Sequence, residues 1–440
     1  MSYLTLRRCV GAALPLLATL GVGAAQAADN IVPIEVRQLH DGHFNLAYVD
    51  VTVCNAAQQC RTVPNVLVDT GSSGLRLYRE ALGGLQLEAV RDDMGRRLGS
   101  AADFAVGGLW GTLHSAQVRV GQVETTQAIP IQLFDAASPS ELRPASYKDD
   151  ARPRFITMGN GVLGISPRRH DPQRYFALHR WGPGAVLPAW NPVDVDASRQ
   201  VVNPIGHFPD PYNNGSVISL PEVDGSAGQK TAQGWLGFGI GQPTAALFPA
   251  AAHVMAHELD EQGKFAAMLG GRRVDLLAHS GSNVLMLDLE PLGLPRHERF
   301  KRFYDAAPLT PLPLAFGANE IELAHPLCIG PAANMKKAID DGYAVLPMLA
   351  IAPIAQDAPN VLGLPFFFGR TVATGLQGAV NPFPPEPPYV GPTLSFDVEE
   401  TVSLEDDSDA EPVAQEAAAK AVDAAFVPAP SPNGFIVFTN

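Results

Sequence analysis

The chain has 440 residues, a formal net charge of −14 and only 17% charged residues. This length predicts two or three domains. The 41 glycines and 39 prolines favour many short strands and loops over long helices. Nucleic acid and anionic membrane surfaces are excluded as expected partners, because both would repel a chain with this negative charge.

The first 27 residues have the features of a secretory signal peptide. Arg7 and Arg8 are basic, residues 10–22 are mostly small and apolar, and residues 25–27 (A-Q-A) fit an A-x-A cleavage site. The apolar run is too short to span a bilayer, and no later stretch is long enough. We therefore expect a periplasmic or secreted protein without a membrane span.

Removal of that segment leaves three cysteines, at positions 54, 60 and 328. Cys54 and Cys60 flank a short polar loop, so in an oxidising compartment we expect them to form a disulfide. Cys328 is then left over, and we interpret it as a buried free thiol. So few sulfur ligands do not support a metal site, and we expect neither a metal nor a cofactor.

Residues 65–77 read N-V-L-V-D-T-G-S-S-G-L-R-L, with an apolar strand before Asp69 and another apolar run after the glycine at position 74. The first strand is expected to carry Asp69 to the floor of a cleft. Gly71 lets the backbone turn close to the acid. Thr70 and Ser72 are expected to hydrogen-bond the carboxylate and keep it ionised. The same residues also form ordinary turns, but the stretch resembles the D-T-G-S-S signature of pepsin-like aspartic proteases.

The segments around this motif read mainly as strands. Residues 31–37 and 44–53 alternate apolar and polar residues and predict two strands before the cysteine loop. A glycine-rich hairpin follows after residue 104, where the resemblance implies a flap with a tyrosine near its tip. Phe104 and Trp110 are the aromatic candidates there, or they simply pack an ordinary hairpin. A short helix is expected around residues 175–179.

A second stretch, residues 276–287, repeats the order of the first as L-L-A-H-S-G-S-N-V-L-M-L. Each copy is followed 80 to 95 residues later by the string V-L-G, whose glycine is expected where one backbone passes close to another. The equivalent positions in the two copies are Asp69 and His279, Thr70 and Ser280, Gly71 and Gly281, and Ser72 and Ser282. This internal repeat predicts two related lobes.

The string G-L-P-F-F-F-G-R at 363–370, together with V-D-T-G-S-S-G-L-R-L and S-G-S-N, is similar to an uncharacterised family of secreted bacterial pepsin-like proteins, a domain of unknown function. The resemblance covers roughly residues 30–395 and implies a mostly β, two-lobed, pepsin-like β-barrel architecture. The expected divisions are a signal peptide (1–27), an N-terminal lobe (28–241), a C-terminal lobe (242–395) and an acidic, partly disordered tail (396–440). Residues 434–439 are expected to return as an edge strand.

The resemblance implies chemistry by two carboxylates that share one proton, but the second acid position holds His279. Asp275 lies four residues upstream, about 13 Å away along the strand, so it cannot take that place. An Asp69–His279 pair should lower the pKa of Asp69 and raise that of His279, because opposite charges favour each charged form.

Two functions follow from this site. One is an aspartic-type endopeptidase with Asp69 as base and His279 as acid. The alternative is a catalytically inactive, pepsin-shaped module that binds peptides or envelope partners. Either is expected to be a monomer with a peptide or protein as substrate or ligand. A zinc protease is not supported, because H-V-M-A-H at 253–257 lacks the required glutamate, and we expect two surface histidines there. A serine hydrolase motif, G-x-S-x-G, is also absent.

Overall fold

The structure is a computed structural model. It describes residues 28–439, except for the segments 105–106, 136–142, 145–146, 148–156, 180–188, 224–227, 251, 356–357 and 386–427. The predicted signal peptide and the acidic stretch 396–412 therefore lie outside the described residues. Within the described part of the chain, no helix is long and apolar enough to cross a membrane.

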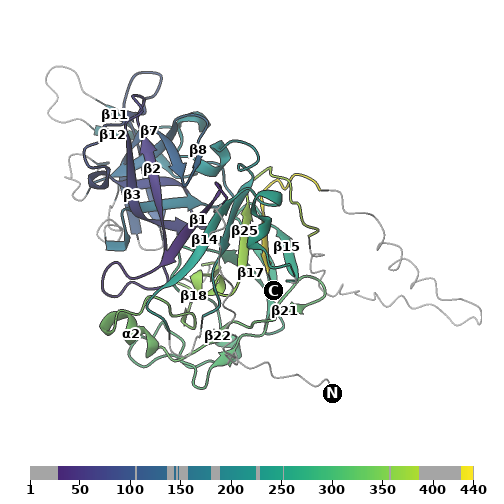
Figure 1. Ribbon diagram of the computed structural model, residues 1–440. Helices are drawn as coiled ribbons and strands as arrows, with labels where there is room; N and C mark the ends of the chain where they lie inside the picture. The colour runs from purple at the N-terminus through teal and green to yellow at the C-terminus, as the bar shows by residue number, and fades with distance from the viewer. Residues whose placement is uncertain are drawn as a thin grey trace, which may run out of the picture.

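Strands are the main regular element of the described structure and form two lobes joined by a central sheet (Figure 1). The central strands are β1 (Ile31–Val36), β13 (Gly215–Ser219), β14 (Ala232–Phe238), β15 (Val254–Glu258), β25 (Thr371–Gly375) and β26 (Phe435–Thr439). The first lobe holds β2 (Ala47–Cys54), β3 (Cys60–Asp69), β4 (Ser73–Tyr78), β5 (Glu88–Ala89), β6 (Leu98–Phe104), β7 (Gly107–Val120), β8 (Val123–Glu124), β9 (Ile129–Phe134), β10 (Gly161–Ile165), β11 (Arg174–His179) and β12 (Ala189–Pro192).

The second lobe holds β16 (Phe265–Leu269), β17 (Arg272–Ala278), β18 (Leu285–Met286), β19 (Thr310–Pro311), β20 (Leu314–Phe316), β21 (Ile321–Glu322), β22 (Cys328–Ile329), β23 (Ala350–Ile351), β24 (Asn360–Leu362) and the helix α2 (Asn334–Asp340). Short 3₁₀ helices connect the strands: η1 (Arg79–Leu82), η3 (Ala197–Arg199), η4 (Pro204–His207), η5 (Gln242–Leu247), η6 (Glu290–Leu292) and η7 (Leu364–Phe366).

The central sheet joins segments from distant parts of the chain. Its antiparallel neighbours run in the order β15, β26, β25, β13, β14 and β1. The predicted edge strand at residues 434–439 is thus wrong in position, because β26 has a partner on each side. All five residues of β26 are buried, and such a continuous apolar run is typical of a strand covered on both faces.

In the first lobe, the predicted approach of the V-L-G segment to the aspartate loop is confirmed. Strand β10 runs parallel to β3 and antiparallel to β4, so it passes between the two strands that flank Asp69. A Cβ atom on Gly164 would lie 2.8 Å from the carbonyl oxygens of Ser72 and Gly74. This position therefore requires glycine for space.

The second lobe repeats that arrangement with shorter strands. Strand β24 runs parallel to β17 and antiparallel to β18. A Cβ atom on Gly363 would lie 2.1 Å from the carbonyl oxygen of Val284. The two copies of the sequence motif therefore occupy equivalent places, and the fold is mostly β and two-lobed.

A hairpin of β6 and β7 extends from the first lobe. Residues 174–179 form strand β11, which pairs with β6 and with β12, so the predicted short helix is wrong. Trp110 on β7 is 2% exposed, and its ring packs edge-to-face against Phe176 and Trp190. Trp110 is thus part of the core of this hairpin. Phe104 is the last residue of β6, and it pairs with Gly107 next to the tip of the hairpin.

The predicted disulfide between Cys54 and Cys60 is present, at the point where β2 turns into β3. Cys328 on β22 is also disulfide-bonded. The interpretation of Cys328 as a free thiol is therefore wrong, although the residue is buried as expected, at 7% exposed.

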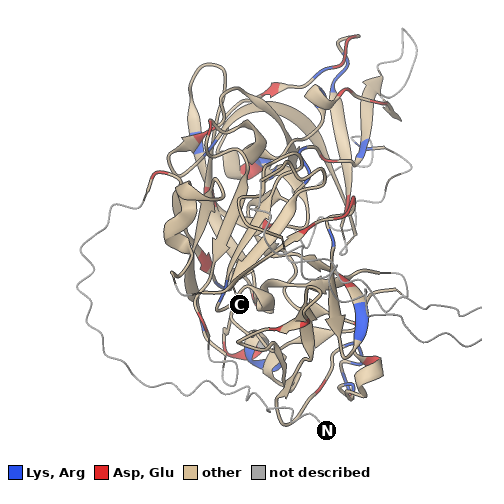
Figure 2. Cartoon of the chain, turned by 90° about the vertical axis from the view of Figure 1, so that its right-hand side faces the viewer, with Lys and Arg blue, Asp and Glu red and all other residues tan. Residues whose placement is uncertain are grey.

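Charged residues of both signs are interspersed along a mostly uncharged chain (Figure 2). This agrees with the charged fraction of 17%. Many of these charges form local ion pairs, as Arg272 does with Asp288 at 3.0 Å. Most of the net negative charge lies in residues 386–427, which carry −10 of the total of −14 and fall outside the described residues. A field from charges more than about 8 Å from a site is largely screened by salt at physiological ionic strength.

Candidate functional site

The ends of β3 and β17 bring Asp69 and His279 together between the two lobes. His279 Nε2 lies 2.8 Å from Asp69 Oδ1. The Asp69 side chain is 5% exposed and that of His279 is 24% exposed. The two residues that the internal repeat pairs are therefore in direct contact, with only the imidazole open to solvent.

Reciprocal hydrogen bonds hold the two loops in register. The Thr70 amide donates to Ser280 Oγ at 3.0 Å, and the Ser280 amide donates to Thr70 Oγ1 at 2.9 Å. Each hydroxyl then donates across the interface, Thr70 to the Ala278 carbonyl and Ser280 to the Val68 carbonyl. The expectation that Thr70 hydrogen-bonds the carboxylate of Asp69 is therefore wrong, because its hydroxyl is used between the lobes.

Gly71 and Gly281 allow this close approach. A Cβ atom on Gly71 would lie 2.3 Å from the ring of His279. A Cβ atom on Gly281 would lie 2.5 Å from Asp69 Oδ1. At both positions, the side chain from the opposite lobe leaves no room for a Cβ atom, so only glycine fits. An alanine at either position would push Asp69 and His279 apart.

Asp69 is held as a carboxylate. The Gly71 amide donates to its Oδ1 at 2.8 Å, and the Ser72 hydroxyl donates to its Oδ2, as the sequence predicts for Ser72. Burial alone would raise the pKa of Asp69, but the charge of His279 and the hydrogen bonds outweigh it and lower the pKa to about 2. Three of the roughly four acceptor positions of a carboxylate are thus filled by the protein.

His279 receives fewer hydrogen bonds from its own loop than Asp69 does. Burial alone would lower its pKa, but the neighbouring Asp69 carboxylate outweighs burial and raises the pKa of His279. Ser282 is equivalent to Ser72, yet its hydroxyl donates to the Val284 carbonyl at 3.0 Å. Nδ1 of His279 has no hydrogen-bond partner among the residues that the structure describes. The contact therefore favours a carboxylate paired with an imidazolium, and both pKa values shift in the directions expected for opposite charges.

A cavity of about 300 Å³ opens above this pair. Its lining includes the apolar side chains of Phe104, Pro167 and Leu277, together with the amides of Gln173 and Gln262. Phe104 comes from the tip of the β6–β7 hairpin, the position at which the resemblance implies a tyrosine. The described residues of the hairpin therefore contribute an aromatic ring to the cavity but no hydroxyl.

A buried ion pair that the sequence analysis missed forms one side of the cavity. Arg76 is 1% exposed and Asp171 is 2% exposed, and their side chains form an ion pair. Arg76 also donates to the Ser73 carbonyl at 2.8 Å and lies 5.4 Å from the centre of the Phe104 ring. Burial raises the pKa of Asp171 despite this partner. The signal in the sequence was an arginine between two leucines in an otherwise apolar strand.

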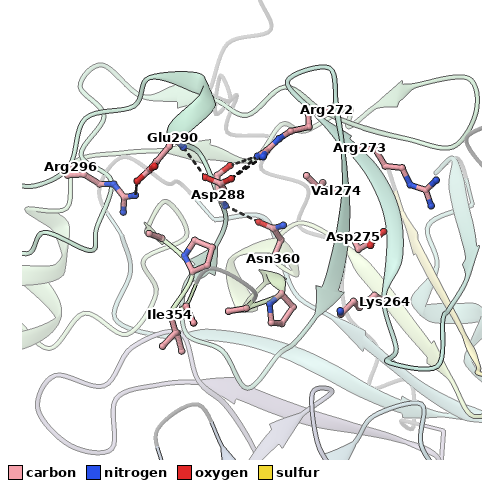
Figure 3. Close-up of a pocket in the computed structure, with 15 residues that line it drawn as sticks. Lys264, Arg272, Arg273, Val274, Asp275, Asp288, Glu290, Arg296, Ile354 and Asn360 are labelled. Atoms are coloured by element: carbon pink, nitrogen blue, oxygen red, sulfur yellow. Dashed lines mark hydrogen bonds and ion pairs between the residues drawn. The ribbon is translucent and has the colours of Figure 1, made fainter. Parts of the chain in front are cut away.

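A second and larger cavity, about 710 Å³, lies elsewhere on the second lobe (Figure 3). Arg272 contacts Asp288 at 3.0 Å, and Arg296 contacts Glu290 at 2.8 Å, so these charges neutralise one another. Asp275 lines this cavity and is not among the residues that line the cavity above Asp69. The prediction that Asp275 does not replace the missing second acid is therefore confirmed.

Neither metal nor zinc-protease chemistry has a site in the described residues. No group of three or more His, Cys, Asp or Glu side chains is close enough there to hold a metal ion. His253 is exposed, but His257 is on strand β15, 8% exposed, and stacked on the rings of Phe265 and Phe438. The expectation of two surface histidines is therefore wrong for His257.

Comparison with known proteins gives a family but no established activity. No curated protein matches the chain. The crystal structure of the aspartic proteinase from Irpex lacteus is similar over 78% of this chain and 93% of that chain, with 12% sequence identity and a TM-score of 0.43. Residues 26–392 match the family described as "Protein of unknown function (DUF3443)", and the chain belongs to that family.

Proposed function

We propose that this protein binds peptides in the cleft above Asp69 and His279 and does not hydrolyse them. The observation that carries the proposal is the direct contact of 2.8 Å between the Asp69 carboxylate and His279. Hydrolysis by two carboxylates depends on one proton shared between two similar acids. Here the contact favours a proton on the imidazole and a carboxylate with a pKa of about 2.

That pair is poorly matched to proton transfer near neutral pH. General acid–base catalysis is most efficient when the pKa of the catalytic group lies near the working pH. The contact lowers the pKa of Asp69, which makes it a weak base, and raises the pKa of His279, which makes it a weak acid. Peptide binding does not require proton transfer, so it does not depend on these pKa values lying near the working pH. The carboxylate can accept hydrogen bonds from a peptide, and the imidazolium can donate them.

The lining of the cavity supports a peptide as the ligand. A peptide carries backbone N–H and C=O groups together with apolar side chains. The cavity offers the amides of Gln173 and Gln262 beside the apolar surfaces of Phe104, Pro167 and Leu277. Small-molecule and peptide sites commonly combine apolar walls with a few placed polar groups in this way.

An aspartic-type endopeptidase with an altered pair is a second candidate, favoured by one specific observation. The His279 side chain is 24% exposed to the cleft, and its Nδ1 has no partner in the described part of the chain. A proton on this ring could therefore reach a bound substrate while Asp69 positions a water.

The test compares turnover and binding in the same preparation. Fluorescein-labelled casein is incubated with the native protein and with Asp69→Ala across pH 3–8, and binding of short labelled peptides is followed by fluorescence anisotropy. We expect peptide binding that is lost in Leu277→Trp, which fills the cavity, and no turnover at any pH. Native turnover that Asp69→Ala abolishes would overturn the proposal and establish the second candidate. Turnover that survives Asp69→Ala would contradict both.

We further infer that the protein acts in the periplasm or outside the cell as a monomer. The support is the signal-like sequence at residues 1–27 and the Cys54–Cys60 disulfide, which suits an oxidising compartment. N-terminal sequencing of material from periplasmic and culture fractions, with sedimentation of the purified chain, tests both statements. A chain that retains residues 1–27 in the cytoplasmic fraction would contradict the location.

A further inference from the structure

The charges that line the cavity above Asp69 are nearly all neutralised by protein partners. Asp69 contacts His279 at 2.8 Å, and Arg76 is paired with Asp171. Asp103 is paired with Arg174 at 3.0 Å, outside the cavity. The charged side chains in the lining are Asp69, Arg76, Asp103, Arg168, Asp171 and His279. Among these, Arg168 is left with a charge that no protein carboxylate neutralises by direct contact in the described structure.

Arg168 follows β10, on the segment that passes beside the Asp69 loop. Its guanidinium donates one hydrogen bond, from Nη2 to the Glu261 carbonyl at 2.9 Å. That bond fixes the side chain against the turn between β15 and β16, which also brings Gln262 and Gly263 to the cavity. The side chain is half-buried. It is therefore held in place with most of its N–H donors unused by the described residues.

A guanidinium in this state is suited to a carboxylate. Arginine stays protonated at all relevant pH values, and its planar donors match the two oxygens of a carboxylate. Hydrogen bonds between two charged groups are stronger than those between neutral groups.

We propose that Arg168 gives the cleft a preference for peptides that carry a carboxylate next to the Asp69–His279 pair. This proposal rests on the proposed peptide binding and names the ligand class and the residue that sets it. The carboxylate is either an Asp or Glu side chain of the peptide or its free C-terminus, and both offer the same chemistry to Arg168.

The test uses labelled hexapeptides with both ends blocked, based on the sequence A-L-F-A-A-A, in which Glu occupies each position in turn. Each is compared with the matched Gln peptide, and a third set carries Gln and a free C-terminal carboxylate. Binding is measured by anisotropy at 0.15 M salt, where the overall negative charge of the protein is screened beyond about 8 Å. We expect the best carboxylate peptide to bind about ten-fold more tightly than its neutral match.

Arg168→Gln should reduce that discrimination to within about two-fold, since the charge-assisted hydrogen bonds are gone. The matched control is Arg61→Gln, which removes the same charge from an exposed arginine that also donates to one carbonyl, that of Ala81. Arg61 is not among the residues that line the cavity. We expect this variant to keep the native preference. Thermal unfolding checks that both variants fold.

The outcomes separate the two proposals. Preference for an internal Glu identifies a side-chain carboxylate, and preference confined to the free C-terminus identifies the peptide end; both support the role of Arg168 when Arg168→Gln removes them. Equal binding of Glu and Gln peptides by the native protein, or a preference that persists in Arg168→Gln, overturns that role while peptide binding stands. Binding of no peptide in any set overturns the peptide-binding proposal and the Arg168 proposal together.

Discussion

The loop that carries Asp69 and the loop that carries His279 share a frame but differ in chemistry. Thr70 and Ser280 exchange equivalent hydrogen bonds, and Gly71 and Gly281 each make room for the residue opposite. The hydrogen bonds differ at the serine after each glycine. In the first loop, the Ser72 hydroxyl donates to Asp69. The hydroxyl of Ser282 instead donates to a carbonyl of its own loop.

This contrast shows that the scaffold and the reacting groups are held by separate interactions. The bonds between the lobes use backbone groups and two hydroxyls, and none of them involves the side chain at the acid position. A histidine can therefore replace an acid in the second loop while the frame keeps its geometry. In the first loop, Gly71 and Ser72 both donate hydrogen bonds to the Asp69 carboxylate. In the second loop, the equivalent serine, Ser282, bonds a backbone carbonyl and not the imidazole.

Removal of each member of the pair should affect stability unequally. His279→Ala leaves a buried carboxylate without its cation and should lower the free energy of unfolding by about 3 kcal/mol at pH 7. Asp69→Ala leaves an imidazole that can lose its proton and is partly exposed, so we expect about 1 kcal/mol. Urea unfolding of the two variants measures both values, and a larger loss for Asp69→Ala would contradict this view of the pair.

The reciprocal bonds between the loops should behave symmetrically. Thr70→Val and Ser280→Ala each leave a buried amide without its acceptor, and each should cost about 2 kcal/mol. The double variant should cost less than the sum, because both substitutions disrupt the same network. A double-mutant cycle in urea tests this, and clearly unequal single effects would show that the frame is not shared.

The two members of the pair should limit stability at opposite ends of the pH range. The pKa of Asp69 falls from its ordinary value of 3.8 to about 2, so its contribution of about 2 kcal/mol is present above pH 3.8 and is lost as the pH falls through 2. The pKa of His279 is raised above 6.5, so its contribution is present below pH 6.5 and is lost as the pH rises through the folded-state pKa.

Single neutral substitutions separate these two limits. Asp69→Asn and His279→Gln each remove the charge that shifts the partner, so both should flatten the pH dependence that the pair causes. We expect the native protein, measured by thermal unfolding, to be stabilised by the pair most fully between about pH 4 and 6.5. An unchanged profile in both variants would show that the pair does not control it.

Loss of the loop serines should give the smallest effects and the clearest contrast. Ser72→Ala removes a hydrogen bond to the charged form of Asp69, so it should raise the pKa of Asp69 and cost about 1 kcal/mol. Ser282→Ala removes the same group from the equivalent position and should leave the Asp69 pKa unchanged. Carboxyl NMR titration of both variants measures this, and equal pKa changes would contradict the separate roles of the two serines.

The repeated motif was enough to predict much of the fold. Two copies of an apolar strand, a polar turn and a second apolar strand, each followed by V-L-G, predicted two equivalent lobes and placed Asp69 opposite His279. These features could be predicted because each depends on residues that are close together in the sequence. They are the alternation of a strand, a glycine where two backbones approach, and two cysteines separated by a short loop. The Cys54–Cys60 disulfide belongs to the same class, since both cysteines lie in one hairpin.

Other features were decided by residues far apart in the chain. Thr70 donates to the opposite lobe, because Ala278 and Ser280 lie beside it only after folding. Residues 174–179 form a strand since β6 offers them an edge, and Asp171 is buried because Arg76 neutralises it. The sequence by itself determined the repeated elements and the two residues of the pair. Tertiary structure alone decided which partners each side chain would meet, since the contacts between the two loops join segments more than 200 residues apart.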